Sequence, residues 1–287
     1  MAYNYLTDTA IQTFINSALA EDIGNGDHST LSSVPSDAYR RAKLIVKSEG
    51  IIAGIELAHH IFATVDPSLK MEIFIPDGSS VKFGDIAFEV YGPAQSILTS
   101  ERLVLNCMQR MSAIATKTSS LSKLIAHTNT KLLDTRKTTP NFRLCEKWAV
   151  TIGGGHNHRF GLFDMVMLKD NHVDFVGSVE AAIDATKAYL SANNLDLKIE
   201  IETRNLDEVA RVLKHGGIHR IMVDNFSIAD TAKAVQLVNG AFEIEASGGI
   251  TETTIVQVAE TGVDFISSGA LTHSAGSLDM SLKAVAE

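Results

Sequence analysis

The sequence predicts an α/β protein in two parts, an N-terminal α+β sandwich and a C-terminal parallel α/β barrel of six strands. Two observations lead to this fold class. Residues 1 to about 95 contain short strand-like segments that are separated by turn signals. The rest of the chain alternates unbroken apolar runs with amphipathic helical patterns, which indicates a parallel sheet covered by helices. An ordinary barrel of this kind has eight such units, so this one is incomplete.

The first part begins with a helical pattern. Apolar side chains recur at helical spacing over residues 9–19, and the turn-forming run 21–27 ends the predicted helix. Three strands are then predicted, at 42–46, 71–75 and 86–90. A long helical pattern covers residues 96–127 and forms either one helix or two, because 116–120 is a weak stretch.

The second part repeats a strand and a helix. Its predicted buried strands lie at 131–134, 165–168, 197–201, 218–223, 242–246 and 265–268. Its predicted helices lie at 179–190, 206–213, 228–238 and 253–260. Such an arrangement brings the carboxyl ends of all the strands to one rim, where α/β barrels gather their functional groups.

Composition excludes several classes of protein. The 287 residues carry a net charge of −9, which disfavours nonspecific binding to nucleic acids or membranes. No apolar stretch approaches the roughly 18 to 20 residues of a membrane span, and the N-terminus lacks the basic start of a secretory signal. Two cysteines cannot build a disulfide framework. We therefore expect a cytoplasmic protein.

Basic residues are concentrated in one window of this acidic chain. Between Lys131 and His172 there are seven basic residues and four acidic ones, together with three histidines. Most such runs are solvated faces. Here, however, several of them follow the predicted strands, so we expect them to lie at one rim and to bind a ligand with several carboxylates or phosphates.

Each of the six predicted strands is followed by polar residues or glycine. The residues singled out at these positions are Thr135, Arg136, Lys137, Lys169, Glu202, Asp224, Ser247, Gly248, Gly249, Ser268 and Gly269, with His158 and Arg159 in the loop between the first two strands. Two glycine-containing turns after the last two strands are typical of a phosphate cradle, because glycine lets backbone N–H groups approach closely.

Glu202 and Asp224 are carboxylates at the ends of neighbouring strands. They can hold ribose hydroxyls, bind Mg2+ through oxygen, or neutralise the nearby cations. A zinc site at His156 and His158 is disfavoured, since no third ligand follows at a suitable spacing. No nucleotide-binding glycine motif and no nucleophile elbow is present.

Six motifs resemble those of one known family. They are Glu21–Asp27, Glu101–Asn106, Thr135–Pro140, Glu146–Val150, Gly153–Arg159 and Lys169–His172. In order and over nearly the whole chain, the sequence is similar to the quinolinate phosphoribosyltransferases. Trp148 and Ala246 depart from the pattern without bearing on the chemistry.

The resemblance implies a reaction and an architecture. The family converts quinolinate and phosphoribosyl pyrophosphate to nicotinate mononucleotide, CO2 and pyrophosphate in NAD biosynthesis, with Mg2+ and no organic cofactor. Its members are homodimers or larger assemblies of dimers. The expected domains are a sandwich over residues 1–112 and a barrel over 113–274, with residues 275–287 packing on the first.

The resemblance also assigns roles to residues. Arg136, His158, Arg159 and Lys169 would contact the carboxylates of quinolinate, with Arg102 reaching in from the neighbouring subunit. Lys137 would lie near the diphosphate. Glu202 and Asp224 would lie near the ribose and Mg2+, and Thr135 would also bind substrate. Ser247, Gly248, Gly249, Ser268 and Gly269 would hold the 5-phosphate.

Three other functions remain open from the residues alone. One is a Schiff-base lyase or aldolase that uses Lys169 or Lys137 in neutral form. Another is a noncatalytic binding protein on the same fold, which the complete set of charged strand ends disfavours. The third is a related phosphoribosyltransferase, either one for nicotinate, which would need one carboxylate contact fewer, or a metal-linked paralogue.

Overall fold

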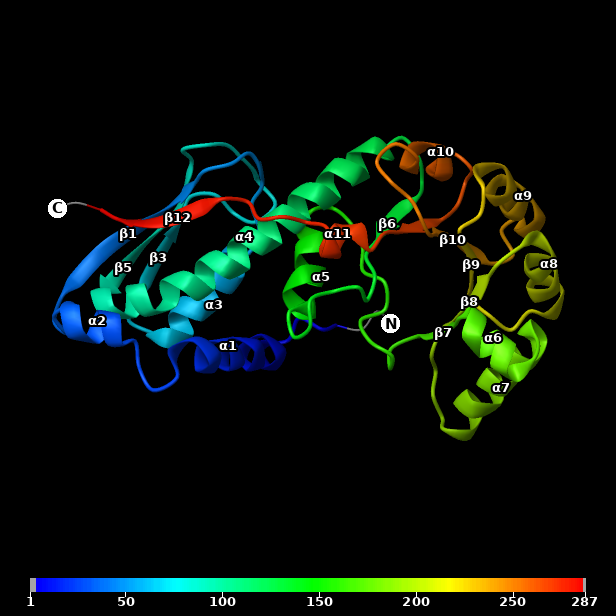
Figure 1. The fold of residues 1–287 in the computed structure, drawn as a ribbon, viewed down its shortest axis with the longest axis horizontal. Helices are drawn as coiled ribbons and strands as arrows, with labels where there is room; N and C mark the ends of the chain where they lie inside the picture. Colours follow the sequence, from blue (N-terminus) through cyan, green and yellow to red (C-terminus); the bar gives the residue numbers. More distant parts are fainter. Residues whose placement is uncertain (1–3, 286–287) are drawn as a thin grey trace. The chain divides into compact units, whose positions relative to one another are not determined.

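The computed structural model describes residues 4–285, which form two compact units (Figure 1). The barrel unit comprises residues 120–136 and 155–269. The sandwich unit comprises the other described residues, 4–119, 137–154 and 270–285. Each unit is therefore assembled from separate stretches of the chain.

The sandwich unit contains an antiparallel sheet of four strands. Their order is β12 (Met280–Ala284), β1 (Tyr39–Val46), β5 (Ile86–Pro93) and β3 (Lys70–Ile73). A separate pair consists of β2 (Gly50–Ile51) and β4 (Ser80–Val81). In the larger sheet Leu44 lies opposite both Phe88 and Leu282, and all three side chains are buried. The core face of this sheet is thus made of hydrocarbon.

Helices complete the sandwich unit. They are α1 (Asp8–Ile23), α2 (His28–Ser33), α3 (Ile55–Val65), α5 (Arg143–Ile152), α11 (Ala270–His273) and the first part of α4 (Ala94–Leu124). Phe62 of α3 packs edge-on against Phe88 of β5, with 5.9 Å between ring centroids. The long α4 is one continuous helix of 31 residues, so the weak stretch at 116–120 does not divide it.

The barrel unit contains six strands, and every neighbouring pair is parallel. Their order is β6 (Lys131–Leu133), β11 (Phe265–Ser267), β10 (Glu243–Ser247), β9 (Arg220–Asp224), β8 (Ile199–Thr203) and β7 (Val166–Leu168). Within residues 4–285, β6 and β7 do not pair with each other, so the barrel is open between them. The predicted six-stranded parallel sheet and its incomplete barrel are confirmed.

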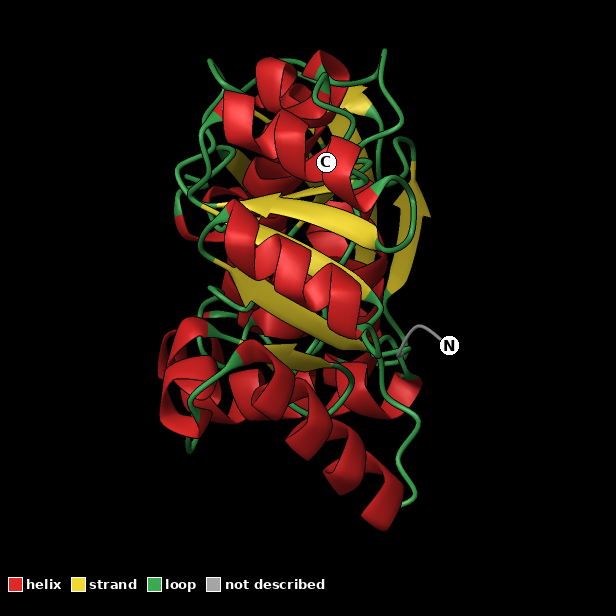
Figure 2. Cartoon of the chain, turned by 90° about the vertical axis from the view of Figure 1, so that its right-hand side faces the viewer, coloured by secondary structure: helices red, strands yellow, loops and turns green. Residues whose placement is uncertain are grey.

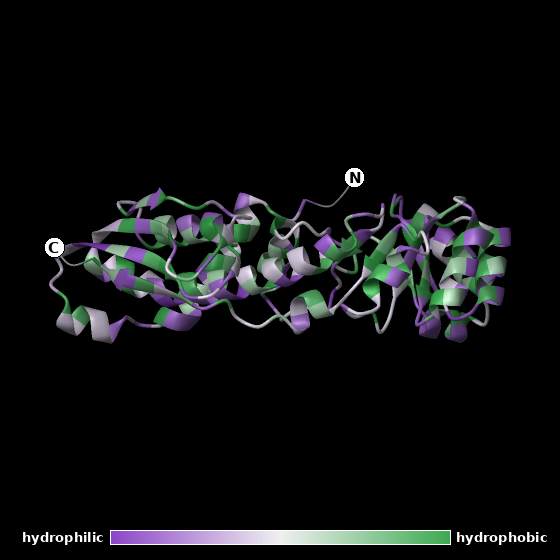
Figure 3. Ribbon diagram, turned by 90° about the horizontal axis from the view of Figure 1, so that it is seen from above, coloured by the Kyte–Doolittle hydropathy of each residue, from purple (hydrophilic) through white to green (hydrophobic). Residues whose placement is uncertain are grey.

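Helices lie beside these strands (Figure 2). They are α6 (Asp170–Val176), α7 (Val179–Ala192), α8 (Leu206–His215), α9 (Ile228–Val238) and α10 (Ile255–Ala259). Ser178, Asn205 and Ser227 cap the starts of α7, α8 and α9, each accepting a backbone N–H three residues ahead. Hydrophobic and hydrophilic residues both occur on these helices (Figure 3), and Val209 and Val212 form the buried side of α8.

Two further observations bear on the expected class of protein. No helix within residues 4–285 is both long and apolar enough to cross a bilayer. Cys107 and Cys145 are both free and buried, and burial raises the pKa of the Cys107 thiol to about 12. Neither thiol is therefore poised to react at neutral pH.

Candidate active site

The expected site residues of the barrel unit lie at one edge of its sheet. Glu202, Asp224 and Ser247 lie at the carboxyl ends of strands β8, β9 and β10, and Asp224 is the register partner of Ser247. Thr135 and Arg136 follow β6, Lys169 follows β7, and Ser268 and Gly269 follow β11. Since the strands are parallel, their carboxyl ends share this edge, which we call the rim.

Two expected site residues belong to the sandwich unit. Lys137 directly follows Arg136 in the chain, and its carbonyl oxygen accepts the hydroxyl of Thr272 at 2.8 Å. Arg102 is exposed on α4. Neither residue is part of the rim as defined by the six strands.

At the rim, Lys169 and Glu202 form an ion pair between adjacent strands. Lys169 Nζ lies 3.2 Å from Glu202 Oε2. The Glu202 side chain is largely buried, whereas that of Lys169 is about half exposed at 48%. The ammonium group therefore remains accessible to an anion while a carboxylate holds it in place.

Arg136 and Arg159 place two guanidinium groups near each other. Burial lowers the pKa of Arg159, and the positive charge of Arg136 lowers it further. Arg159 is anchored by a hydrogen bond from Nη1 to the carbonyl oxygen of Met165 at 3.0 Å. An anion bound between two half-buried positive charges reduces the repulsion between them, so these two arginines favour a carboxylate or phosphate ligand.

Asp134 holds the loop that carries Arg159. This carboxylate is fully buried at the end of β6, and it accepts the His158 N–H at 2.9 Å and the Asn157 side-chain amide at 2.5 Å. His156 donates its N–H to Leu132 at 2.8 Å, so residues 156–158 run alongside β6. The basic loop is thus fixed by the strand that precedes it.

Asn225 and Gly248 fit closely at the ends of β9 and β10. Asn225 adopts the left-handed region, with φ of 57°, and donates its N–H to the Ser247 carbonyl oxygen at 2.8 Å. Its side-chain amide donates to Asp224 at 2.7 Å. A Cβ on Gly248 would lie 2.2 Å from Asn225 Oδ1, and Gly248 has φ of 91°. Glycine is therefore required here by both space and conformation.

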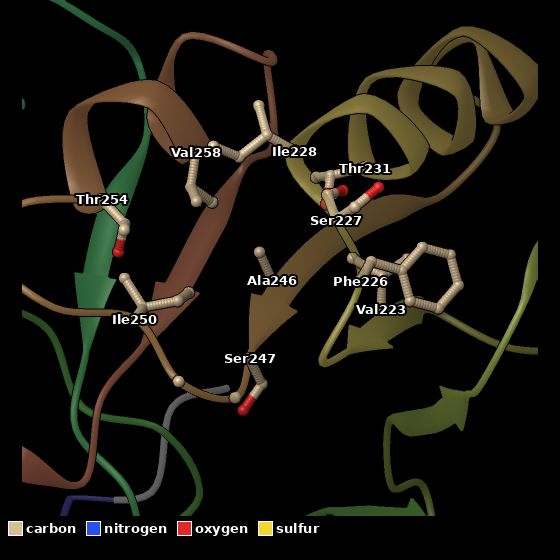
Figure 4. A pocket seen from close by; sticks show the side chains of 12 residues that line it. Val223, Phe226, Ser227, Ile228, Thr231, Ala246, Ser247, Ile250, Thr254 and Val258 are labelled. Carbon is tan, nitrogen blue, oxygen red and sulfur yellow. The ribbon is translucent and has the colours of Figure 1, made fainter.

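A cavity of about 300 Å³ opens beside this turn (Figure 4). Ser247, Gly248 and Gly249 line it together with residues of α9 and α10, among them Ile228 and Val258. Ser268 and Gly269 are not part of this lining, and the Ser268 N–H already donates to the Leu133 carbonyl oxygen at 3.0 Å. The turn at 247–249 therefore lines the cavity, whereas in the turn at 268–269 the backbone N–H of Ser268 is already used within the protein.

His158 points away from solvent into a cluster of charged side chains inside the barrel. Its Nε2 lies 3.1 Å from Glu200 Oε2 and 3.2 Å from Glu245 Oε2, and both glutamates are fully buried. Arg220 Nη1 lies 2.9 Å from the same Glu245 oxygen. The guanidinium also stacks over the ring of Phe265, at 3.9 Å from its centroid.

Protons in this cluster are shared. Burial lowers the pKa of His158, but attraction to Glu245 and the hydrogen bond to Glu200 outweigh it and raise that pKa to about 9. Nδ1 nevertheless accepts the Arg159 N–H at 2.7 Å, which requires a lone pair on that nitrogen. Burial, and then repulsion by Glu245, raise the pKa of Glu200. The shared proton lies on either His158 or Glu200, and both distributions leave the four groups with zero net charge.

Comparison with known protein families shows which family the chain belongs to. The family model for the quinolinate phosphoribosyl transferase C-terminal domain matches residues 114–283, and the model for the N-terminal domain matches residues 27–112. The chain belongs to the quinolinate phosphoribosyltransferase family. The family membership expected from the motifs is confirmed.

Individual members of the family are similar over nearly the whole chain. A chloroplastic nicotinate-nucleotide pyrophosphorylase (carboxylating) from Oryza sativa is 48% identical over 95% of this chain and 77% of its own length. Quinolinate phosphoribosyltransferase (decarboxylating) 1b from Nicotiana tabacum is 48% identical over 94% of this chain and 81% of its own. The crystal structure of NadC from Streptococcus pyogenes superposes with a TM-score of 0.91 at 38% identity, covering 98% of both chains.

The rim suits the divalent cation that the family implies. Burial raises the pKa of Glu202, and repulsion from Asp224 and Asp170 adds to this effect, although Lys169 opposes it. Carboxylate oxygens are hard ligands of the kind that Mg2+ prefers, although these three are not gathered within 4.8 Å of one another, as the ligand atoms of His158, Glu200 and Glu245 are. The residues present therefore offer donors of the right chemistry for the ion.

Several residues near the rim escaped the sequence analysis. Asp134 and Asn225 stand among the polar residues at the ends of the predicted strands, but no role was predicted for them. Glu200, Arg220 and Glu245 lie inside predicted strands, where ionisable side chains interrupt the apolar residues. Such interruptions are the signal that could have revealed a charged cluster within the barrel.

Proposed function

We propose that this chain transfers the phosphoribosyl group of phosphoribosyl pyrophosphate to quinolinate. Loss of CO2 then gives nicotinate mononucleotide, with pyrophosphate as the other product. The observation that carries this proposal is the match of both family domains over the chain, supported by relatives from rice and tobacco named for this reaction. The enzyme is accordingly a pentosyltransferase that needs no organic cofactor.

Quinolinate binds through its two carboxylates to the basic side of the rim. Arg136 and Arg159 carry neighbouring positive charges, and the ammonium group of Lys169 is about half exposed. Guanidinium groups match carboxylates in a bidentate manner. When quinolinate binds, Lys169 exchanges part of its contact with Glu202 for a substrate carboxylate.

Phosphoribosyl pyrophosphate binds on the side of β8 to β11. Glu202 and Asp224 hold the ribose, and their carboxylates would also hold Mg2+. Lys137 neutralises the diphosphate, and Thr135 contacts the substrates beside it. The 5-phosphate lies at Ser247, Gly248 and Gly249, which line the cavity beside β10, with Ser268 and Gly269 on the next strand.

The chemistry follows from these charges. Mg2+ supplies charge neutralisation for the departing pyrophosphate. As the C1–O bond of the ribose breaks, positive charge develops at C1, and the carboxylates of Glu202 and Asp224 stabilise it. The ring nitrogen of quinolinate donates its electron pair to C1 and becomes cationic. When the 2-carboxylate departs as CO2, the electron pair of the broken C–C bond stays on C2, where the adjacent cationic nitrogen stabilises it until a proton binds there.

Dimerisation completes the site in this proposal. Arg102 is exposed on α4 and belongs to the sandwich unit rather than to the rim. We assign it to the quinolinate pocket of a partner subunit in a homodimer, which can assemble further. We also assign the chain to the cytoplasm, whereas the rice relative is described as chloroplastic; fractionation of cells tests this location.

The decisive experiment measures CO2 and pyrophosphate release in the presence of phosphoribosyl pyrophosphate. Quinolinate should give both products in equal amounts, and nicotinate should react more slowly by several powers of ten, since a site built for two carboxylates leaves one group unpaired with nicotinate. Comparable turnover of nicotinate would overturn the substrate assignment. A borohydride-trapped adduct on Lys169 or Lys137 with a keto substrate would instead support a Schiff-base enzyme.

A further inference from the structure

A second layer of charge lies beneath the rim, on the same face of the barrel sheet. Side chains alternate between the two faces of a strand, so residues two or four apart share a face. Glu200 shares its face with Glu202, Arg220 with Asp224, and Glu245 with Ser247. Two residues along a strand correspond to about 6.6 Å, so Glu200 and Glu245 lie one such step below the rim residue of their own strand, and Arg220 lies two steps below.

The buried layer is internally balanced. Glu245 Oε2 is shared by Arg220 Nη1 at 2.9 Å and His158 Nε2 at 3.2 Å, and Glu200 faces the same imidazole at 3.1 Å. Arg220 is further held by Glu243 at 3.1 Å and by the Phe265 ring. Buried charges are retained when each has a partner of the opposite sign, as these have.

His158 connects this layer to the rim. Its backbone N–H donates to Asp134 at 2.9 Å, and its Nδ1 accepts the backbone N–H of Arg159 at 2.7 Å. The Glu200 carboxylate also opposes the lowering of the Arg159 pKa. The ring therefore holds the backbone from which Arg159 extends.

We propose that His158, Glu200, Arg220 and Glu245 form a positioning layer that holds Arg159 in place for quinolinate, and that His158 itself does not contact the substrate. Both imidazole nitrogens have partners within the protein, so His158 has no ring nitrogen left for a carboxylate unless it gives one up. The layer acts on quinolinate through Arg159 and leaves phosphoribosyl pyrophosphate unaffected. This inference rests on the proposed binding of quinolinate at the rim.

The same three ligand groups could in principle bind a metal ion, because atoms of His158, Glu200 and Glu245 all lie within 4.8 Å of one another. Arg220 argues against this use. Its guanidinium already supplies the positive charge, and it contacts the Glu245 oxygen that faces His158. Stoichiometric metal in purified protein, lost in Glu245→Gln, would overturn the proposal in favour of a metal site.

The main test is a double-mutant cycle with Glu245→Gln and Arg159→Ala. Glu245→Gln alone should raise the KM for quinolinate by on the order of tenfold and leave the KM for phosphoribosyl pyrophosphate within about twofold. In the Arg159→Ala background, Glu245→Gln should cause no additional loss, because its effect passes through Arg159. Additive losses would show that the layer does not act through this arginine and would overturn the proposal.

The matched control is Glu243→Gln. Glu243 contacts the same guanidinium, but its side chain is 41% exposed, so its loss should leave both KM values within about twofold. Wild-type turnover of quinolinate must first be established. Its absence would defeat the proposed function, whereas additivity in an active enzyme would defeat only the positioning layer.

A structure of the wild-type enzyme with quinolinate tests the proposal even where the variants do not fold. His158 Nε2 should keep its contacts to Glu200 and Glu245, and Nδ1 should keep the Arg159 N–H. A quinolinate oxygen at hydrogen-bonding distance from either ring nitrogen would overturn the assignment. Arg159, in contrast, should contact a substrate carboxylate directly.

Discussion

The two sheets of this enzyme bury very different material on their core faces. In the antiparallel sheet, Leu44, Val46 and Phe88 are fully buried hydrocarbon. In the parallel sheet, Glu200 and Glu245 are just as completely buried, and they face Arg220. Burying hydrocarbon stabilises a fold directly, whereas burying ion pairs brings a desolvation penalty that the pairing only offsets. The contrast indicates that the barrel interior is organised for its site and the sandwich core for stability.

The largest expected effect concerns the rim and its metal ion. Exhaustive chelation should abolish turnover, because the departing pyrophosphate would lose its neutralising cation. Mg2+ or Mn2+ should restore activity, and Zn2+ alone should not. The melting temperature should change little, since the fold needs no metal. Full activity after chelation would remove the role assigned to Glu202 and Asp224.

Arg159→Ala should come next in size. We expect kcat/KM for quinolinate to fall by about three orders of magnitude, as is usual when a buried charge partner of a ligand is removed. Steady-state kinetics measures this effect, and the KM for phosphoribosyl pyrophosphate provides the internal control. An unchanged kcat/KM would mean that the arginine pair lies outside the quinolinate pocket.

Mixed dimers test whether the sandwich unit also carries catalytic function. Arg102→Ala and Lys137→Ala should each be inactive alone. If Arg102 acts in the partner's site, a heterodimer has one site with both defects and one intact site. Random mixing makes about half of the dimers heterodimers, so roughly a quarter of wild-type activity should return. No recovery after confirmed subunit exchange would place Arg102 in its own subunit's site or in packing.

Phe88→Ala should separate stability from function. Phe88 is fully buried and packs against Phe62, so its truncation should lower the free energy of unfolding by about 3–5 kcal/mol. The kinetic constants of the folded fraction should stay near those of the wild type. Urea unfolding and active-site titration together measure the two quantities. A specific loss of quinolinate affinity would contradict the proposed division between the sheets.

The smallest effect should come from an exposed ion pair on the barrel helices. The hydrogen bond from Arg211 lowers the pKa of Glu180 to about 2. A folded-state pKa below the usual 4.5 means that the pair stabilises the protein above about pH 4.5 and ceases to do so as the pH falls toward 2. Unfolding of wild type and Glu180→Gln should differ slightly at pH 7 and converge at low pH, where a persistent difference would disprove this linkage.

The sequence allowed the barrel to be predicted well because largely apolar strands with polar ends alternate with amphipathic helices. Glu202, Asp224 and Ser247 could be placed at one edge for this reason alone. In contrast, β12 and α3 were not predicted, since the pairing of β12 with β1 and the packing of α3 on Phe88 arise only in the tertiary structure. The path of residues 156–158 along β6 depends likewise on the Asp134 carboxylate.

The charged layer could not be derived from the sequence for a different reason. Glu200 and Glu245 lie 45 positions apart, and strand register decides whether they meet. A shift of one residue would have sent either glutamate to the opposite face of the sheet. The direction of the His158 ring is also decided by the tertiary structure. From the sequence alone, a histidine beside an arginine could bind an anionic ligand or contact buried carboxylates.

The return of the chain to its first sheet has a consequence for biosynthesis. β1 ends at Val46, and its partner β12 begins at Met280, 234 positions later. At about 5–20 residues per second, a ribosome needs on the order of 10 to 50 seconds to synthesise the intervening chain. The open edge of β1 must meanwhile be kept from pairing with other nascent chains. The sandwich unit therefore closes only after the barrel unit, although its first strand is made first.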